Sequence, residues 1–363
     1  MRRTAVISEG ELRGLLGRVC QTTRLMAPVK RGKASFDFAA VTDPSAVVFD
    51  YVRTLMPPKK AIWPTRDAIL EFDLTKNAAK PVLDERPFVL FGIHACDLKA
   101  VNQLDWAMGQ RNDVADAHYL ARRKAATIVG MECLPDEYCF CTSVGSCETR
   151  EGADLFLTPL GDGQGQATGG ARSQSPSYFV EVLSEKGEAL AKQASGMRGA
   201  TAKDEAAAKA FVEKKKQSTK LKINAQMKEL PDLLDAQYDS GTFEATAQRC
   251  YSCGTCTNVC PTCFCFDVDD QVDLLLQAGQ RARTYDSCQF QDFAVVTGGH
   301  NFRRERADRV RHRWFRKFVY LLREHGEPFC IGCGRCSKSC TAGISLVDVL
   351  NTVVGEARKE AVR

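Results

Sequence analysis

Two runs of cysteine near the C-terminal end of the chain share one spacing. Each reads C-x2-C-x2-C-x3-C. In this ferredoxin-type pattern, three closely spaced thiolates hold one [4Fe-4S] cube and the fourth cysteine ligates the other cube. We therefore predict two clusters with crossed ligands. One set is Cys250, Cys253, Cys256 and Cys340, and the other is Cys330, Cys333, Cys336 and Cys260.

The residues between these cysteines favour tight backbone loops. Gly254 lies between ligands of the first run, and Gly332 and Gly334 lie between ligands of the second. A single C-x-x-C pair could equally be a zinc site or an incidental buried thiol, but zinc sites generally combine two separated pairs or use histidine as well. Two complete runs therefore favour paired [4Fe-4S] clusters.

Composition limits the setting in which this chemistry takes place. The chain has 363 residues, of which 17 are cysteine, and a net charge of +5. It contains no apolar run long enough for a transmembrane helix. Glu9, Glu11 and Arg13 occupy the stretch that would be apolar in a signal peptide. We therefore expect a cytoplasmic protein, in which cysteines serve metal or redox chemistry rather than disulfides.

Positive charge is concentrated between Arg303 and Lys317, where aromatic residues are interleaved with eight basic ones. A basic stretch with aromatics can bind nucleic acid. A solvated face beside two anionic clusters, or a docking surface for an acidic partner, explains the same pattern and is preferred. We expect no nucleic-acid ligand.

Further cysteines follow two buried-strand candidates in the N-terminal half. The apolar segments 88–93 and 126–131 have the length of buried strands, with helical stretches at 97–108 and 115–123. Ligands gather outside the carboxyl ends of strands in open α/β sheets. We therefore predict a third cluster. Its ligands are Cys96, Cys133, Cys139 and Cys141, and Cys147 is an alternative to either of the last two. Ordinary buried or loop cysteines, or a zinc site, are the other interpretations.

The remaining segments suggest an α+β chain that begins with an N-terminal α/β domain. A mostly helical dicluster domain of the α-helical ferredoxin type should follow it. We expect a short strand at 47–51, strands at 154–160 and 178–183 joined by a Gly-rich loop, and helices through 185–248. The insert between the cysteine runs should be helical at 269–276 and 304–323, and a helix at 345–356 should close the chain. The expected domains are residues 1–200, a helical linker at 201–248, and residues 249–363.

Several longer motifs resemble one known group of proteins, the iron–sulfur subunits of anaerobic sulfite reductases and the beta subunits of cytoplasmic sulfhydrogenases. The resemblance covers most of the chain and departs from the family pattern at Ala95 and Cys147. The matching motifs are Ala27-Pro28-Val29-Lys30, Asp50-Tyr51-Val52-Arg53, Pro57-Pro58-Lys59, Cys96-Asp97-Leu98, Cys139-Phe140-Cys141, Cys260-Pro261-Thr262-Cys263-Phe264-Cys265, Asp286-Ser287-Cys288 and Gly299-His300-Asn301-Phe302-Arg303.

The resemblance implies an electron-transfer subunit of a hetero-oligomer, placed between a flavin/NAD(P)-binding subunit and a terminal redox subunit. The sequence agrees, because it shows no dinucleotide-binding fingerprint and no nucleophile motif. Sulfite, protons, polysulfide or a heterodisulfide-reductase-type module are all open as terminal acceptors. The rival classes are an iron–sulfur sensor that binds nucleic acid and a metal-stapled scaffold without a redox role.

Three cysteines outside the two runs match the family motifs without an assigned role. They are Cys263, Cys265 and Cys288. We expect them to pack in the interior, since free cysteine is among the most buried residue types. Their closeness to Cys260 in the sequence leaves a ligand role open.

Overall fold

The computed structural model describes residues 3–161 and 176–362. It divides the chain into two compact units. The first comprises Met1–Pro64, Leu83–Glu137 and Ser146–Lys220, and the second comprises Thr65–Val82, Tyr138–Gly145 and Leu221–Arg363. The three domains expected at residues 1–200, 201–248 and 249–363 stay a prediction. The Gly-rich loop expected after residue 160 lies almost wholly outside the described residues.

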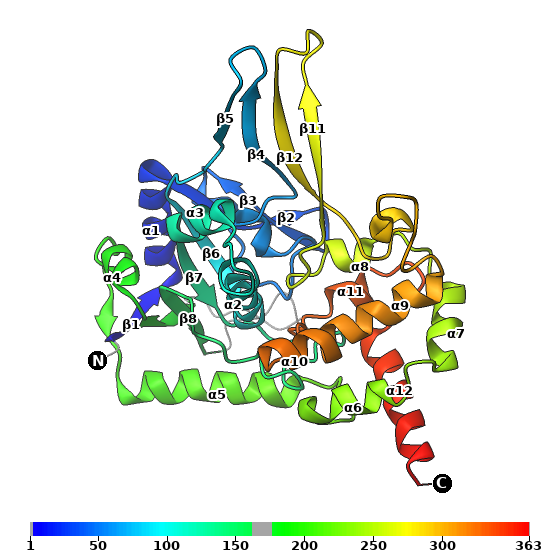
Figure 1. The fold of residues 1–363 in the computed structure, drawn as a ribbon. Coiled ribbons are helices and arrows are strands. Elements are labelled where there is room, and N and C mark those ends of the chain that lie inside the picture. Colours follow the sequence, from blue (N-terminus) through cyan, green and yellow to red (C-terminus); the bar gives the residue numbers. More distant parts are fainter. Residues whose placement is uncertain (1–2, 162–175, 363) are drawn as a thin grey trace. The chain divides into compact units, whose positions relative to one another are not determined.

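The first unit is built on an eight-stranded sheet with the order β10-β1-β9-β8-β7-β6-β2-β3 (Figure 1). Four neighbouring strands run parallel, and antiparallel strands flank them. The parallel strands are β2 (Arg24–Arg31), β6 (Phe88–His94), β7 (Ala126–Met131) and β8 (Leu155–Leu160), and the others are β1 (Arg3–Ser8), β3 (Ser35–Val41), β9 (Ser177–Val182) and β10 (Arg198–Gly199). The strands expected at 88–93, 126–131, 154–160 and 178–183 are confirmed.

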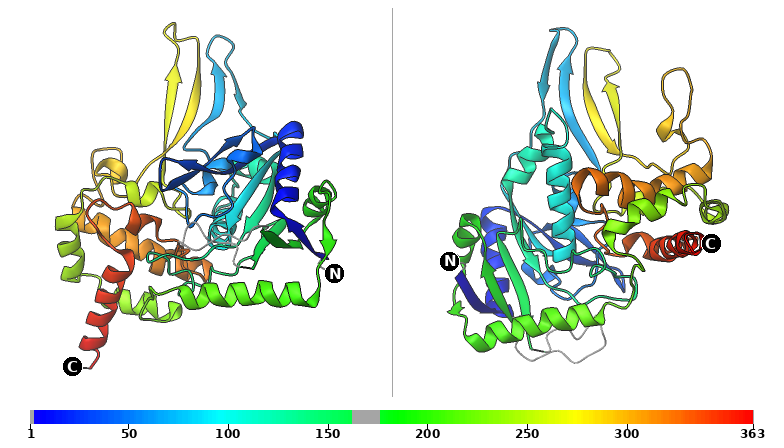
Figure 2. Two further views of the ribbon diagram at one scale, coloured as in Figure 1. Left: turned by 180° about the vertical axis from the view of Figure 1, so that it is seen from behind. Right: turned by 60° about the horizontal axis from the view of Figure 1, so that its bottom comes forward.

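Helices cover this sheet because its central strands are apolar throughout. Every residue of β6 is buried, which is typical of a strand covered on both faces. Apolar side chains of α1 and α4 pack against Phe91, Val129 and Leu157. The helices of this unit, visible in Figure 2, are α1 (Glu9–Thr22), α2 (Ala95–Gly109), α3 (Ala117–Ala125), α4 (Glu185–Ala191) and α5 (Ala202–Ser218). The helical stretches expected at 97–108 and 115–123 are confirmed by α2 and α3.

The strand expected at residues 47–51 is wrong. Only Val47 pairs, in an isolated bridge with Val29 of β2, and the Val48 N–H donates to the Pro28 carbonyl at 2.9 Å. β2 already pairs with β3 from Leu25 to Arg31, so the segment contacts only the other edge of β2, beyond the end of its pairing with β6 at Met26. Val47, Phe49 and Tyr51 are nevertheless buried and Val48 is half-buried, which explains the strand-like pattern.

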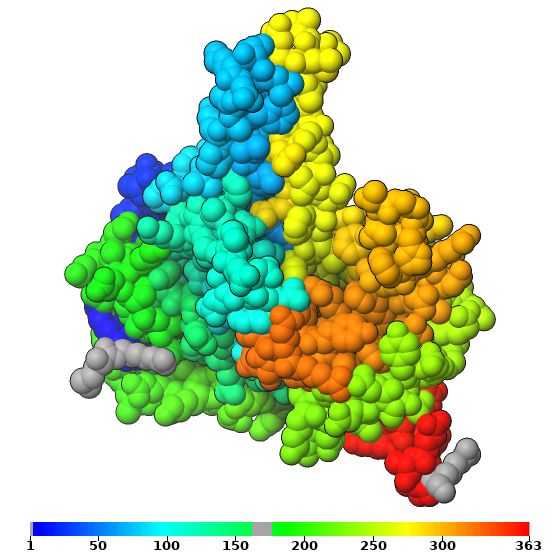
Figure 3. Space-filling model, in the orientation of Figure 1, coloured from blue at the N-terminus to red at the C-terminus, as the bar shows by residue number. Residues whose placement is uncertain are grey.

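The second unit contains a four-stranded antiparallel sheet with the order β11-β12-β4-β5. Figure 3 shows its two hairpins side by side, one blue and one yellow. The strands are β4 (Arg66–Asp73), β5 (Ala78–Pro81), β11 (Phe266–Val272) and β12 (Ala278–Tyr285). The helix expected at residues 269–276 is therefore wrong. Arg281 of β12 binds the Asp270 carboxylate of β11 through two 2.7 Å hydrogen bonds, and Leu274 to Leu276 lie exposed in the turn rather than on a helix face.

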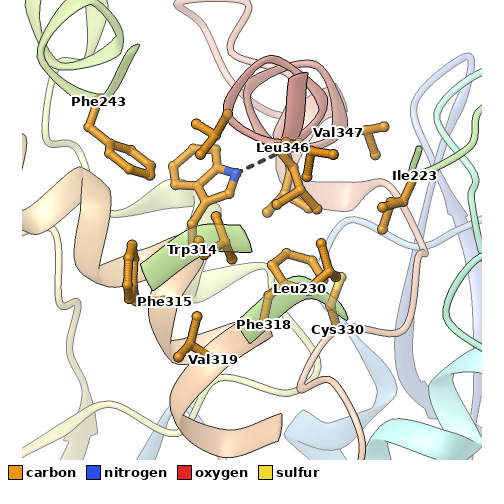
Figure 4. Packing of buried hydrophobic residues seen from close by; sticks show 14 of the residues in the cluster. Ile223, Leu230, Phe243, Trp314, Phe315, Phe318, Val319, Cys330, Leu346 and Val347 are labelled. Atoms are coloured by element: carbon orange, nitrogen blue, oxygen red, sulfur yellow. Dashed lines mark hydrogen bonds between the residues drawn. The ribbon is translucent and has the colours of Figure 1, made fainter. Parts of the chain in front are cut away.

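Helices form the hydrophobic core of the second unit. Trp314 lies at its centre, between Phe243 and Leu346, and its indole N–H donates to the Leu346 carbonyl at 3.0 Å (Figure 4). The main helices are α6 (Leu230–Asp235), α7 (Gly241–Arg249), α9 (Arg306–Phe315), α10 (Leu321–His325) and α12 (Leu346–Glu360), with a π-turn at Arg316–Tyr320 between α9 and α10. The helices expected at 304–323 and 345–356 are confirmed. Among residues 3–161 and 176–362, no helix is long and apolar enough to cross a lipid bilayer.

Candidate functional site

The first predicted ligand set lines one pocket of the second unit. Cys250 follows α7, Cys256 lies in the short helix α8 (Thr255–Asn258), and Cys340 follows α11 (Arg335–Lys338). The pocket is lined by Cys250, Cys253, Cys256 and Cys340, together with Cys336 and apolar side chains such as Val310, Trp314 and Ile344. Cys340 thus lines the same pocket as three cysteines of the other run, and so does Cys336. The crossed assignment of the ligands stays a prediction.

Tight turns place the first three sulfurs around this pocket. Ser252 and Gly254 adopt left-handed backbone conformations, with φ of 52° and 72°. A Cβ at position 254 would lie 2.6 Å from the Phe290 ring, so glycine is required there for space as well as for conformation. Two backbone N–H groups point at ligand sulfurs at 3.4 Å, from Ser252 to Cys250 Sγ and from Ile344 to Cys340 Sγ.

These features fit a thiolate-ligated cluster. Five thiols line this largely apolar pocket, and four of them form the predicted donor set of a [4Fe-4S] cube. Hydrogen bonds to the sulfurs and burial are among the factors that set the potential of such a cube. Burial raises the pKa of Cys256 to about 12, while Arg313 opposes this effect. Metal must displace the proton from such a thiol, so binding of the cluster and loss of protons are coupled.

The second predicted ligand set includes two deeply buried thiols. Cys260 and Cys330 are 7% and 9% exposed. Burial raises the pKa of Cys330 to about 12, Lys317 lowers it, and the charges of Cys336 and Cys260 raise it further. Cys260 and Cys336 are therefore both close enough to Cys330 for their charges to act on it.

A short segment from the middle of the chain packs on the second cysteine run. The Phe140 N–H donates to the Gly332 carbonyl at 2.8 Å. A Cβ on Gly332 would lie 2.5 Å from the Cys141 backbone nitrogen, and one on Gly334 would lie 2.4 Å from the Tyr138 carbonyl oxygen. Both glycines have positive φ. The run therefore needs glycine at both positions in order to fit beneath residues 138–141.

The predicted third ligand set is divided between the two units. Cys139 and Cys141 belong to the second unit, whereas Cys96 and Cys133 belong to the first, as does the alternative ligand Cys147. Cys96 lies in the first turn of α2, directly after β6, and Cys133 follows the end of β7. Both positions are at carboxyl ends of parallel strands, as expected. Assignment of these four cysteines to one cluster stays a prediction.

Three cations of the basic stretch turn inward at helical spacing. Arg309, Arg313 and Lys317 are 4–5% exposed, so they do not belong to a solvated face. The Arg313 guanidinium donates to the Cys256 carbonyl at 3.3 Å. Burial acts to lower the pKa of Lys317, but the charges of Cys260, Cys263 and Cys330 outweigh it and raise the pKa. The burial of these cations beside cysteines was not predicted from the sequence, although their i, i+4, i+8 spacing puts them on one face of a helix.

Comparison with known proteins identifies the family of this chain. The sequence pattern described as a 4Fe-4S dicluster domain matches residues 249–344. Sulfhydrogenase 2 subunit beta of Pyrococcus furiosus is 38% identical over 337 residues, which cover 93% of this chain and 94% of that protein. The chain belongs to the sulfhydrogenase beta-subunit family. The predicted resemblance is thereby confirmed, and this beta-subunit homologue is an iron–sulfur protein of the 4Fe-4S type. No solved structure matches the chain.

Proposed function

We propose that this chain relays electrons within a multi-subunit oxidoreductase, between a flavin/NAD(P)-binding subunit and a terminal redox subunit. The observation that carries the proposal is the pocket in which Cys340 joins Cys250, Cys253 and Cys256. A protein with two thiolate-ligated cubes, and with no dinucleotide-binding fingerprint in its sequence, is suited to passing electrons on rather than to substrate chemistry.

Each cluster has a proposed set of four thiolates. Cys250, Cys253, Cys256 and Cys340 would hold one, and Cys330, Cys333, Cys336 and Cys260 would hold the other. When bound, the cubes supply centres that are reduced and oxidised reversibly. The residues of the chain orient the sulfurs through left-handed turns, exclude water with apolar side chains, and place cations beside the sulfurs.

The buried cations support a redox role over a scaffold role. Reduction adds negative charge to a cluster, and a cation in a poorly hydrated interior stabilises that charge strongly. Arg313 lies beside the first ligand set and Lys317 beside the second. Their burial also removes them from the surface that a nucleic-acid sensor would present.

The relative suggests what kind of partners to expect. Its name describes a beta subunit of a sulfhydrogenase, so by analogy this chain works in a hetero-oligomer in the cytoplasm, without nucleic acid and without a membrane span. A flavin/NAD(P) subunit would be the electron donor or acceptor on one side. Sulfite, protons, polysulfide or a heterodisulfide-reductase-type module remain candidates on the other.

A third cluster bound by Cys96, Cys133, Cys139 and Cys141 is part of this proposal. Four thiols that follow strand ends or lie in one short loop suit such a site, and all except Cys96 are less than one tenth exposed. Full-length Cys96→Ser protein, prepared anaerobically, should contain about four irons fewer than the wild type. Unchanged iron would refute this site and leave the other two untouched.

The relay is tested by isolating the complex and the chain separately. Affinity purification from the source organism under anaerobic conditions should recover a flavin-containing subunit with the chain. The isolated chain should accept electrons from a low-potential donor, yet should neither oxidise a pyridine nucleotide nor reduce a sulfur compound. Stoichiometric flavin in the isolated chain, or turnover with a nicotinamide cofactor, would contradict the proposal.

A further inference from the structure

The base of the β11–β12 hairpin gathers three cysteines that the two ligand sets do not use. Cys263 and Cys265 precede β11, and Cys288 follows β12. The strands pair to their ends, with Phe266 opposite Tyr285, and the Asp286 N–H donates to the Cys265 carbonyl at 3.1 Å. The hairpin therefore holds residues 265 and 288 together, although they are well separated in the sequence.

The three thiols contact one another or a neighbouring thiol. The side chains of Cys265 and Cys288 lie within hydrogen-bonding reach of each other, and so do those of Cys260 and Cys263. Cys263 also lies within electrostatic range of both Cys265 and Cys288. We call Cys263, Cys265 and Cys288 the hairpin-base trio. A converging group of this kind differs from Cys20, whose thiol donates to the Val41 carbonyl.

The surroundings of Cys288 contain sulfur and polar groups. Its side chain lies close to the Cys265 side chain and the Gln289 amide. Cys288 is only 3% exposed, and the Gln289 amide donates to its sulfur at 3.5 Å. A buried thiol that is surrounded by other thiols and by a polar donor has the environment of a ligand.

Cations surround the trio as well. Phe264 is the residue between Cys263 and Cys265, and the Arg316 guanidinium lies 4.7 Å from the centre of its ring. The positive charge of Arg316 acts to lower the pKa of Cys265. The buried Lys317 ammonium acts on Cys263. A cation beside a thiol favours its negatively charged form, which is the form that binds metal.

We propose that Cys263, Cys265 and Cys288 ligate a further iron–sulfur cluster in the second unit, distinct from the clusters of the two cysteine runs. A cluster is preferred to zinc because all three cysteines lie within the region that matches a 4Fe-4S dicluster domain. Cys260 is assigned to the cluster of the second run, so the trio itself supplies three thiols. A cube can be held by three thiolates when a small non-protein ligand completes the coordination of its fourth iron.

The first test compares Cys265→Ser with Cys20→Ser in the full-length chain, both prepared and reconstituted anaerobically. Cys20 lies outside every proposed ligand set and has a similar, intermediate exposure. We expect Cys265→Ser to contain about four irons and four sulfides fewer than Cys20→Ser, with unchanged far-ultraviolet circular dichroism. Equal iron in the two variants overturns the proposal, as does one stoichiometric zinc in the wild type.

A second test needs no variant and so does not depend on variant folding. Iron-loaded wild-type protein is treated with iodoacetamide, and labelling of each cysteine is followed by peptide mass spectrometry. We expect Cys263 and Cys265 to react at least about ten times more slowly than Cys20, and to react at a similar rate once ferricyanide and a chelator have removed the iron. Labelling at the rate of Cys20 before iron removal, or a Cys265–Cys288 disulfide in the anaerobic protein, overturns the proposal.

Discussion

The ammonium nitrogen of Lys317 lies 3.2 Å from the Sγ atom of Cys260. Its two other donors are also used, by Thr262 Oγ1 at 3.1 Å and by the Phe329 carbonyl at 2.9 Å. A lysine has three donors and no acceptor, so every proton of this buried ammonium has a partner. The helix forms a π-turn over the residues that include Lys317, and π-turns occur frequently at functional sites.

Replacement of Lys317 by glutamine should lower the reduction potential of the cluster held by the second cysteine run. The positive charge stabilises the reduced, more negative form, and its loss should shift the potential downward by an amount on the order of 100 mV. A redox titration followed by electron paramagnetic resonance measures this shift. Arg304→Gln is the matched control, because Arg304 belongs to the same basic stretch but is exposed. Equal potentials in the two variants would mean that Lys317 does not tune the cluster.

Alanine at position 332 should prevent the second cysteine run from forming its cluster. Gly332 and Gly343 both have φ of 63°, so alanine costs each about 1–2 kcal/mol of backbone strain. Only at position 332 would the new Cβ collide with the backbone of Phe140 and Cys141, whereas Gly343 has open space.

Iron content and the apparent melting temperature of the two glycine variants measure the difference. Gly343→Ala should keep the full iron content of the wild type and melt slightly earlier. Gly332→Ala should lose about four irons and melt much earlier. If the two variants had the same iron content and melting temperature, the packing of residues 138–141 over the second run would be refuted.

The Cys256→Ser and Cys333→Ser variants should each lack one cluster. The two residues belong to different cubes under the crossed assignment, so each variant should contain about four irons fewer than Cys20→Ser. Anaerobic iron and sulfide analysis measures the loss. If the double variant lost no more iron than either single variant, both cysteines would serve one cluster and the crossed assignment would fail.

The side chain of His312 should make the second unit less stable in mild acid. Burial, followed by the charges of Arg303 and Arg316, lowers the pKa of His312 to about 4, whereas the pKa of histidine in an unfolded chain is about 6.5. As the pH falls through this interval, the unfolded chain takes up a proton that the folded chain does not, so stability falls. Between pH 7 and pH 5 the loss should be about 2 kcal/mol.

The His312→Gln variant isolates this contribution. Chemical denaturation of wild type and variant at both pH values, under anaerobic conditions, gives the two pH-dependent losses of stability. Their difference should equal the contribution of the histidine, because other titrating groups are common to both proteins. Parallel losses in the two proteins would show that His312 is solvated or already charged.

Sequence patterns predicted the parts of this fold that depend on local chemistry. The apolar run at residues 88–93 predicted a buried strand, and the cysteine spacing predicted the dicluster domain that the family comparison finds at residues 249–344. The hairpin at β11–β12 was missed, because its stabilising partners Asp270 and Arg281 oppose each other only once the strands have paired. The leucines of its turn also have high helix propensity, which local sequence context does not correct.

Contacts between distant segments were beyond prediction from one sequence. Nothing in the local pattern shows that residues 138–141 lie against Gly332, or that Lys317 reaches Cys260. The grouping of Cys263 and Cys265 with Cys288 depends on the register of β11 and β12. Each of these contacts is fixed by packing of the whole second unit rather than by neighbours in the chain.

The second unit is assembled from three separate stretches of the chain, residues 65–82, 138–145 and 221–363. During synthesis, the early stretches leave the ribosome long before β12 and the second cysteine run exist to receive them. Cluster insertion should therefore follow completion of translation rather than accompany it. For the same reason, the gene segment encoding the dicluster region alone is a poor unit for duplication or fusion, because it would arrive in a new protein without β4 and without the loop that covers Gly332.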